Sequence, residues 1–136
     1  MKKILLIALV GSFFFEGYAQ MTVNGVSLPA KLKTSSTELT LNGAGVRKKA
    51  FFKVYVLGLF LREKNKDAAD IIKANEEMAV RLQITSSVVS SGNMSSAIKE
   101  GFEKSLKGNY NAMKPKIEAF IEIFSKDEIK EGDVFL

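Results

Sequence analysis

The fold of this chain is decided by residues 51–61, which read FFKVYVLGLFL. Successive side chains of a β-strand point to opposite faces of the sheet, so the odd-numbered and even-numbered residues of this stretch form two separate sets. Both sets are apolar except for Lys53 and Tyr55. A strand with two apolar faces is covered on both sides. We therefore predict that residues 51–61 form a central strand.

The segments around this strand predict further, less buried strands. Residues 38–41 alternate polar and apolar side chains and predict a half-buried strand that ends at the turn signal Asn42-Gly43. Residues 78–85, MAVRLQIT, alternate in the same way and predict a strand with one face in water. Residues 25–32 contain a proline, which cannot donate to a central ladder, so this segment is expected at an edge.

Three segments have the spacing of helices. Residues 67–74 begin with an aspartate that can cap a short helix. Residues 94–106 carry apolar side chains at helical spacing and are closed by Gly108, and residues 113–124 repeat the pattern with Pro115 in the first turn. The order of strands, helix, strand and two helices predicts an α+β fold, an antiparallel sheet with a layer of helices on one side.

The N-terminal residues have the outline of a signal peptide. Two lysines precede an uncharged apolar run over residues 4–15, and Gly17 and Ala19 are small residues at the positions expected before a cleavage site. The run is too short for a spanning helix, which needs about 20 apolar residues. We therefore expect residues 1–19 to be removed. This leaves an exported domain, residues 20–136, that is periplasmic or secreted and has no stable membrane span.

The composition of the 136 residues excludes several classes of function. The chain has no histidine, cysteine or tryptophan, and its net charge is +5. Without imidazole or thiol there is no Ser-His-Asp relay, no disulfide and no zinc site of the usual kind, so no metal is expected. The densest basic run, residues 47–49, shows no interleaving with aromatic side chains, so it predicts solvated surface and no nucleic-acid partner.

Residues 41–49, LNGAGVRKK, followed by residues 52–61, FKVYVLGLFL, resemble the chalcone isomerase-like family, and most closely its bacterial exported branch. The resemblance extends over residues 24–136. It implies an open-faced β-sandwich, in which a ligand cleft lies between a large antiparallel sheet and a layer of helices. Family members continue past the turn at residues 130–133 with further strands and a helix. We therefore expect a domain that is incomplete at its C-terminus and ends inside a strand.

The resemblance implies one of two functions. The isomerases of the family close a chalcone to a flavanone with an arginine, a threonine, a tyrosine and an asparagine. This chain matches the arginine with Arg47 but has Tyr55, Met94 and Gly101 at the other positions. The non-catalytic fatty-acid-binding branch pairs the arginine with a tyrosine, as Arg47 and Tyr55 do here. The resemblance therefore favours a binder over an isomerase.

The expected ligand is a fatty acid or a similar small apolar carboxylate, held by a monomer without a cofactor and without catalytic residues. A guanidinium can grip a carboxylate with two bonds, and a phenol adds a third donor. Lys53, on the face of Tyr55 by simple alternation, competes as the anion partner or extends to solvent. The residues expected along the tail are apolar: Leu57, Met94, Ile98, Phe102, Met113 and Phe120.

Several alternatives to these expectations remain open. Arg47 is also explained as an ordinary surface cation, and Tyr55 as a core aromatic residue. The apolar helix residues are core residues first and cleft lining second. The chain as a whole is alternatively an intramolecular lyase of the chalcone isomerase type, or a truncated domain without an intact pocket.

Overall fold

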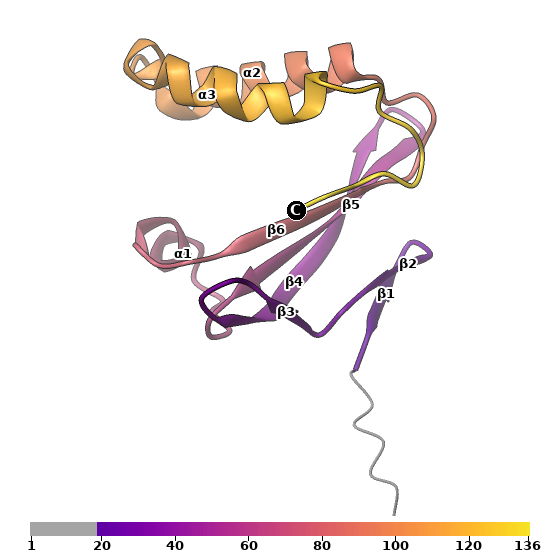
Figure 1. The fold of residues 1–136 in the computed structure, drawn as a ribbon, viewed down its shortest axis with the longest axis vertical. Coiled ribbons are helices and arrows are strands. Elements are labelled where there is room, and N and C mark those ends of the chain that lie inside the picture. Colours follow the sequence, from indigo (N-terminus) through magenta and orange to yellow (C-terminus); the bar gives the residue numbers. More distant parts are fainter. Residues whose placement is uncertain (1–18) are drawn as a thin grey trace, which may run out of the picture.

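The computed structural model describes residues 19–136, so the predicted signal peptide, apart from its last residue, lies outside them. The described part is an antiparallel five-stranded sheet in the order β3-β4-β5-β6-β7, with a separate hairpin β1-β2 and three helices (Figure 1). The elements are β1 (Met21–Val23), β2 (Val26–Leu28), β3 (Lys31–Lys33), β4 (Glu38–Lys49), β5 (Phe52–Leu61), α1 (Ala68–Lys73), β6 (Ala79–Ile84), α2 (Ser91–Leu106), α3 (Tyr110–Ser125) and β7 (Val134–Phe135). The predicted α+β class is confirmed.

Strand β5 is the central strand, as its two apolar faces predict. It pairs with β4 on one side and β6 on the other, and Val56 and Phe60 are fully buried within it. At the far edge of β6, the C-terminal apolar residues form β7, which pairs Phe135 with Leu82. The long β4–β5–β6 ladder thus forms the body of the sheet.

Different elements cover the two faces of this sheet (Figure 1). On one face, which we call the hairpin face, Val56 and Phe60 pack with Val26 and Leu28 of β2. On the other face, which we call the helix face, Ile84 packs with Met94 of α2 and Phe124 of α3. The layer formed by α2 and α3 therefore lies on one side only, as the sequence predicts.

The hairpin β1-β2 is an element that the sequence analysis did not separate from the edge segment. It turns at Asn24 and Gly25, which both have positive φ, 50° and 78°. Asn-Gly is the strongest short signal for such a turn because both residues tolerate the left-handed conformation. The signal is present in the sequence, and the hairpin could have been predicted from it.

The predicted end of the strand at Asn42-Gly43 is wrong. Strand β4 continues through both residues to Lys49, and Gly43 does not have positive φ. Asn42 is instead the extra residue of a register shift between the pairs Leu41–Phe60 and Gly43–Leu59. Its side-chain oxygen accepts a hydrogen bond from the backbone N–H of Asn65 at 2.8 Å. A bulge and a turn favour the same residue types, which is why the pattern misled.

The helix ends are largely where the sequence places them. Asp67 caps α1, and Ser90 caps α2 in a reciprocal capping box with Asn93. Helix α2 ends at a left-handed Lys107 followed by Gly108. None of the helices among residues 19–136 is long and apolar enough to cross a membrane.

The predicted place of Pro115 in a first turn is wrong. Helix α3 begins at Tyr110, three residues earlier than its apolar stripe, so Pro115 lies in the second turn. A proline there removes one backbone hydrogen bond, the one that its N–H would have donated to the carbonyl of Asn111. The helix continues because Ile117 and Phe124 are buried on its inner face.

Gly58 on the hairpin face of β5 lies in tight contact with core side chains. A Cβ added there would lie 3.2 Å from Leu41 and 3.3 Å from both Leu28 and Phe60. We expect Gly58→Ala to lower the free energy of unfolding by about 1–3 kcal/mol, because a filled core must shift to admit the methyl group. The measurement is urea unfolding beside Gly45→Ala, whose Cβ meets nothing within 4 Å. Equal stability of the two variants would contradict this account.

Candidate ligand-binding site

The β4–β5 register brings the two predicted head-group donors together. Arg47 lies directly opposite Tyr55, and Tyr55 in turn lies opposite Ile84 of β6. Residues that face one another across antiparallel strands share a face of the sheet, with Cβ atoms about 4.5–5.5 Å apart. Ile84 belongs to the core beneath the helices, so Arg47 and Tyr55 both lie on the helix face.

A cavity of about 390 Å³ begins at Arg47 and follows the same two strands. Its lining consists of β4 and β5 residues alone: Asn42, Gly43, Ala44, Gly45, Val46, Arg47, Leu57 and Leu59. This space is wide open to solvent, so a ligand in it would be covered on the side of the sheet alone. Arg47 is the one charged residue in this lining, so the cavity is an apolar groove with a cation at one end.

Two glycines form the floor of this groove. Gly43 lies opposite Leu59, and Gly45 opposite Leu57, so all four residues share the helix face with Arg47. A Cβ added to either glycine would meet no atom within 4 Å. Glycine usually weakens a strand, and here it leaves open space above the sheet. Both glycines and Leu59 are absent from the site residues predicted from the sequence, although a Gly-x-Gly spacing in a strand places two bare positions on one face.

Arg47 and Tyr55 both have hydrogen-bond donors that are free to bind an anion. Arg47 is exposed and Tyr55 is half-buried, packed against the core cluster that contains Ile84 and Met94. Within residues 19–136 neither the guanidinium nor the phenol makes a hydrogen bond or an ion pair. Both groups thus have free donors: Arg47 lines the groove, and Tyr55 lies outside the lining, opposite Arg47.

Lys53 does not share the face of Tyr55, contrary to the alternation expected from sequence. The pair Arg47–Tyr55 is followed by Lys48–Lys53, so Val54 is an extra residue in β5. This register shift turns Lys53 to the hairpin face. Its ammonium group donates a hydrogen bond to the side-chain oxygen of Asn24 at 2.9 Å. Lys53 therefore lies away from the groove.

The predicted tail-lining residues separate into different places. Leu57 lines the groove, whereas Met94 is 5% exposed and belongs to the core between α2 and the sheet. Ile98 is half-buried beside the same core. None of the helix residues lines the groove, so its lining comes from the sheet.

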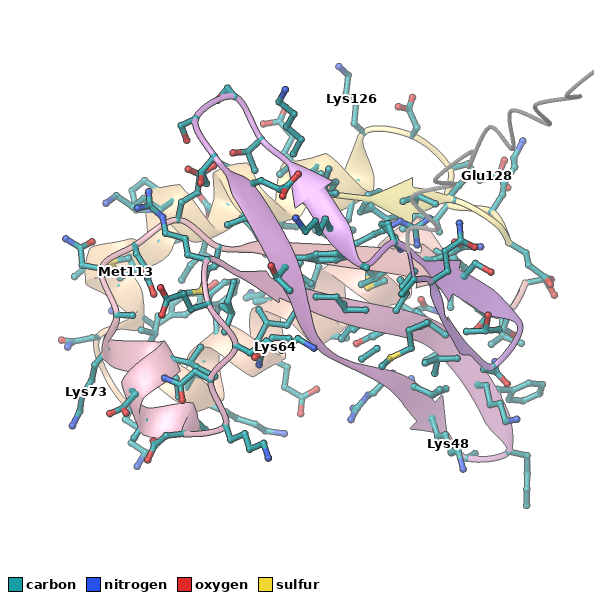
Figure 2. All side chains as sticks on the ribbon, turned by 90° about the horizontal axis from the view of Figure 1, so that it is seen from below. Lys48, Lys64, Lys73, Met113, Lys126 and Glu128 are labelled. Atoms are coloured by element: carbon teal, nitrogen blue, oxygen red, sulfur yellow. The ribbon has the colours of Figure 1, made fainter. Side chains whose placement is uncertain are left out.

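The other three predicted tail-lining residues, Phe102, Met113 and Phe120, lie on the helical layer. Phe102 of α2 and Phe120 of α3 pack edge to face, with ring centroids 5.8 Å apart. Met113 is 38% exposed, and Figure 2 shows it on the side of the molecule away from Lys48. Gly101, at the family's asparagine position, is exposed on α2. Phe102 and Phe120 thus hold the two helices together.

The remaining features of the described chain do not extend this site. Among residues 19–136 no group of acidic side chains is arranged to hold a metal ion. A smaller cavity, of about 160 Å³, lies beside α1 and contains none of the residues predicted from the sequence. The groove that starts at Arg47 is therefore the candidate site.

Comparisons with known proteins agree with this architecture. A family model described as chalcone isomerase-like matches residues 20–136. No curated protein sequence matches the chain. Among solved structures, the chain is similar to the crystal structure of a fatty-acid binding protein from Arabidopsis thaliana, with a TM-score of 0.66 and 19% sequence identity. The match covers 85% of this chain and 70% of the plant protein. At this identity the likeness shows the fold.

Proposed function

The chain belongs to the chalcone isomerase-like family, and on that premise we propose that it binds a fatty acid or a similar small apolar carboxylate. One observation carries the proposal: Arg47 lies at the charged end of a glycine-floored apolar groove, and Tyr55, which is outside the groove lining, lies opposite Arg47 in the β4–β5 register. The fatty-acid binding protein of similar fold supports the same class of ligand. The proposed role is binding.

The head of the ligand is a carboxylate on Arg47 and Tyr55. A guanidinium can donate two parallel bonds to a carboxylate, and the phenol can donate one more without adding charge. Each charge-assisted bond contributes roughly 1.5–3 kcal/mol, less where water screens it. Because Arg47 is exposed, the lower end of this range applies. The head group therefore orients the ligand more than it retains it.

The tail lies along the groove from Arg47 towards Gly43. Four residues of strand correspond to about 13 Å. Leu57 and Leu59 provide the apolar wall, and the two glycines leave room for the chain of methylenes. Each buried methylene contributes about 0.8 kcal/mol. The tail therefore supplies most of the affinity.

The test compares a fatty acid with its ester. We expect the protein to bind cis-parinaric acid and to release it to palmitate more readily than to methyl palmitate, which keeps the tail but lacks the charge. Arg47→Ala should weaken palmitate binding roughly tenfold and remove the preference over the ester. The readout is parinarate fluorescence in a displacement titration.

Arg62→Ala is the matched control, because Arg62 is an exposed arginine of the same chain that does not line the groove. Equal binding of palmitate by the parent protein and the Arg47→Ala variant would overturn the proposal. A chalcone cyclisation rate above the spontaneous one, lost in Arg47→Ala, would instead assign the isomerase reaction.

A further inference from the structure

The turn between β4 and β5 exposes two aromatic side chains to solvent. Phe51 is 101% exposed and Phe52 is 51% exposed. The sequence pattern assigns Phe51 to the central strand, but the structure places it in the turn after Ala50, whose φ is +52°. A fully exposed phenylalanine contributes no core packing. Together with its neighbour Phe52, it gives the end of the hairpin an apolar patch that faces water.

Cations surround these aromatic rings. Residues 47–53 read RKKAFFK, with four basic residues and no acidic one, and no acidic residue occurs anywhere from residue 39 to residue 62. We call residues 47–53 the tip. Figure 2 shows Lys48 at the end of its strand, with its side chain directed away from the body of the molecule. The tip is therefore a small apolar patch flanked by basic side chains.

The arrangement of these cations costs stability. Lys48 lies directly opposite Lys53 in the β4–β5 register, and like charges at facing positions destabilise a hairpin. The Lys53 ammonium is bonded to the neutral Asn24 side chain, which leaves its charge uncompensated. On the helix side, Lys104 lowers the pKa of Glu100 by a hydrogen bond and by its charge, and the charge of Lys49 lowers it further. Glu100 thus already has a cationic partner in Lys104.

We propose that the tip docks on the surface of an anionic lipid bilayer, with Phe51 inserted among the headgroups. The aromatic ring has the apolar surface that leaves water on insertion, and the surrounding cations meet anionic lipid. An anionic surface also relieves the repulsion between Lys48 and Lys53. This interaction goes beyond the proposed binding of a carboxylate and stands without it.

The tip adjoins the groove. The register pairs from the turn inward are Lys49–Phe52, Lys48–Lys53 and Arg47–Tyr55, so the charged end of the groove is the third pair. Docking therefore brings the end of the groove that holds Arg47 close to the bilayer. A ligand with a lipid tail would have a short path between the two.

The first experiment uses Phe51→Trp, which gives the chain its one tryptophan. Vesicles of phosphatidylcholine mixed with phosphatidylglycerol should move the fluorescence emission of the new tryptophan to shorter wavelength, and vesicles of phosphatidylcholine alone should not. Ile72→Trp is the matched control, because Ile72 is 83% exposed on α1, far from the tip. Emission that stays unchanged at the tip, or shifts equally at both positions, would overturn the proposal.

The second experiment measures co-sedimentation with the same vesicles. We expect Phe51→Ser to weaken binding roughly tenfold or more, and Lys48→Glu/Lys49→Glu to weaken it at least roughly thirtyfold. Ile72→Ser and Lys66→Glu/Lys73→Glu make the same chemical changes near α1, and Figure 2 shows Lys73 at the other side of the molecule from Lys48. These controls should retain binding, apart from the weaker effect of net charge.

Three results would contradict docking on lipid. They are no sedimentation of the parent protein, equal losses in the tip and control variants, and loss of a self-associated form rather than of vesicle binding. Palmitate titration of the tip variants in solution separates this test from that of the groove. Phe51→Ser leaves the lining of the groove and its charge intact, so it should bind palmitate like the parent protein.

Discussion

A Gly45→Leu variant is expected to lose fatty-acid binding and to remain folded. Gly45 lies opposite Leu57 on the floor of the groove, and a side chain added there enters open space. A leucine side chain displaces about four methylenes of a bound tail, which corresponds to roughly 3 kcal/mol, or about a hundredfold in Kd. Parinarate fluorescence measures the loss of binding, and urea unfolding measures stability.

The matched control for this variant is Gly101→Leu. Gly101 also has nothing within 4 Å of an added Cβ, but it lies on the exposed side of α2. Both variants should be at least as stable as the parent protein, because leucine is favoured over glycine in strands and helices. If Gly45→Leu binds palmitate with unchanged affinity, the groove is not the site. If it unfolds the protein, the space above Gly45 is not open.

The second large effect is expected from Phe124→Ala. Phe124 is 7% exposed, and its ring centroid lies 5.5 Å from that of Phe120 and 4.7 Å from that of Phe135 in β7. It therefore joins α3 to the sheet. Truncation of a buried phenylalanine costs about 3–5 kcal/mol, out of a total stability of about 5–15 kcal/mol for a domain. Urea unfolding should show a loss of this size.

Phe120→Ala provides the comparison for this prediction. Phe120 lies one helical turn before Phe124 and touches Phe102 and Phe124, but it is 44% exposed. Its truncation should cost less than that of Phe124, because less of its surface leaves water on folding. Amide exchange should show the inner face of α3 opening in Phe124→Ala. A larger loss in Phe120→Ala would mean that the helices depend on each other more than on the sheet.

Elements whose sequence pattern reflects a local rule could be predicted. The central strand is recognisable because its side chains are apolar in both registers: the hairpin face of β5 is buried, and its helix face is half-buried where Leu57 and Leu59 line the groove. The caps at Asp67 and Ser90 are recognisable because a side chain must satisfy free backbone N–H groups at a helix start. The hairpin turn at Asn24 and Gly25 obeys such a rule as well, and was missed.

Features that depend on strand pairing could not be read from the sequence alone. The extra residues Asn42 and Val54 shift the β4–β5 register without a distinct local signal, and each changes which side chains share a face. For this reason Asn42 was taken for a turn and Lys53 for a neighbour of Tyr55. The pairing of Arg47 with Tyr55 came from the family resemblance, and the register then placed them opposite each other. That Gly43 and Gly45 share one face follows from their spacing, but that this face is the one with Arg47 and Leu57 follows only once the register is known.

The extra residue Val54 also determines how many positive charges lie at the end of the groove. Regular alternation would place the ammonium of Lys53 beside Tyr55, next to the guanidinium of Arg47. With the shift, the groove lining carries one positive charge. One guanidinium neutralises one carboxylate, whereas a phosphomonoester head carries about −1.5 to −2 at neutral pH and keeps an uncompensated charge. If the groove binds an anion as proposed, the single inserted residue should therefore favour a monoanion over a dianion.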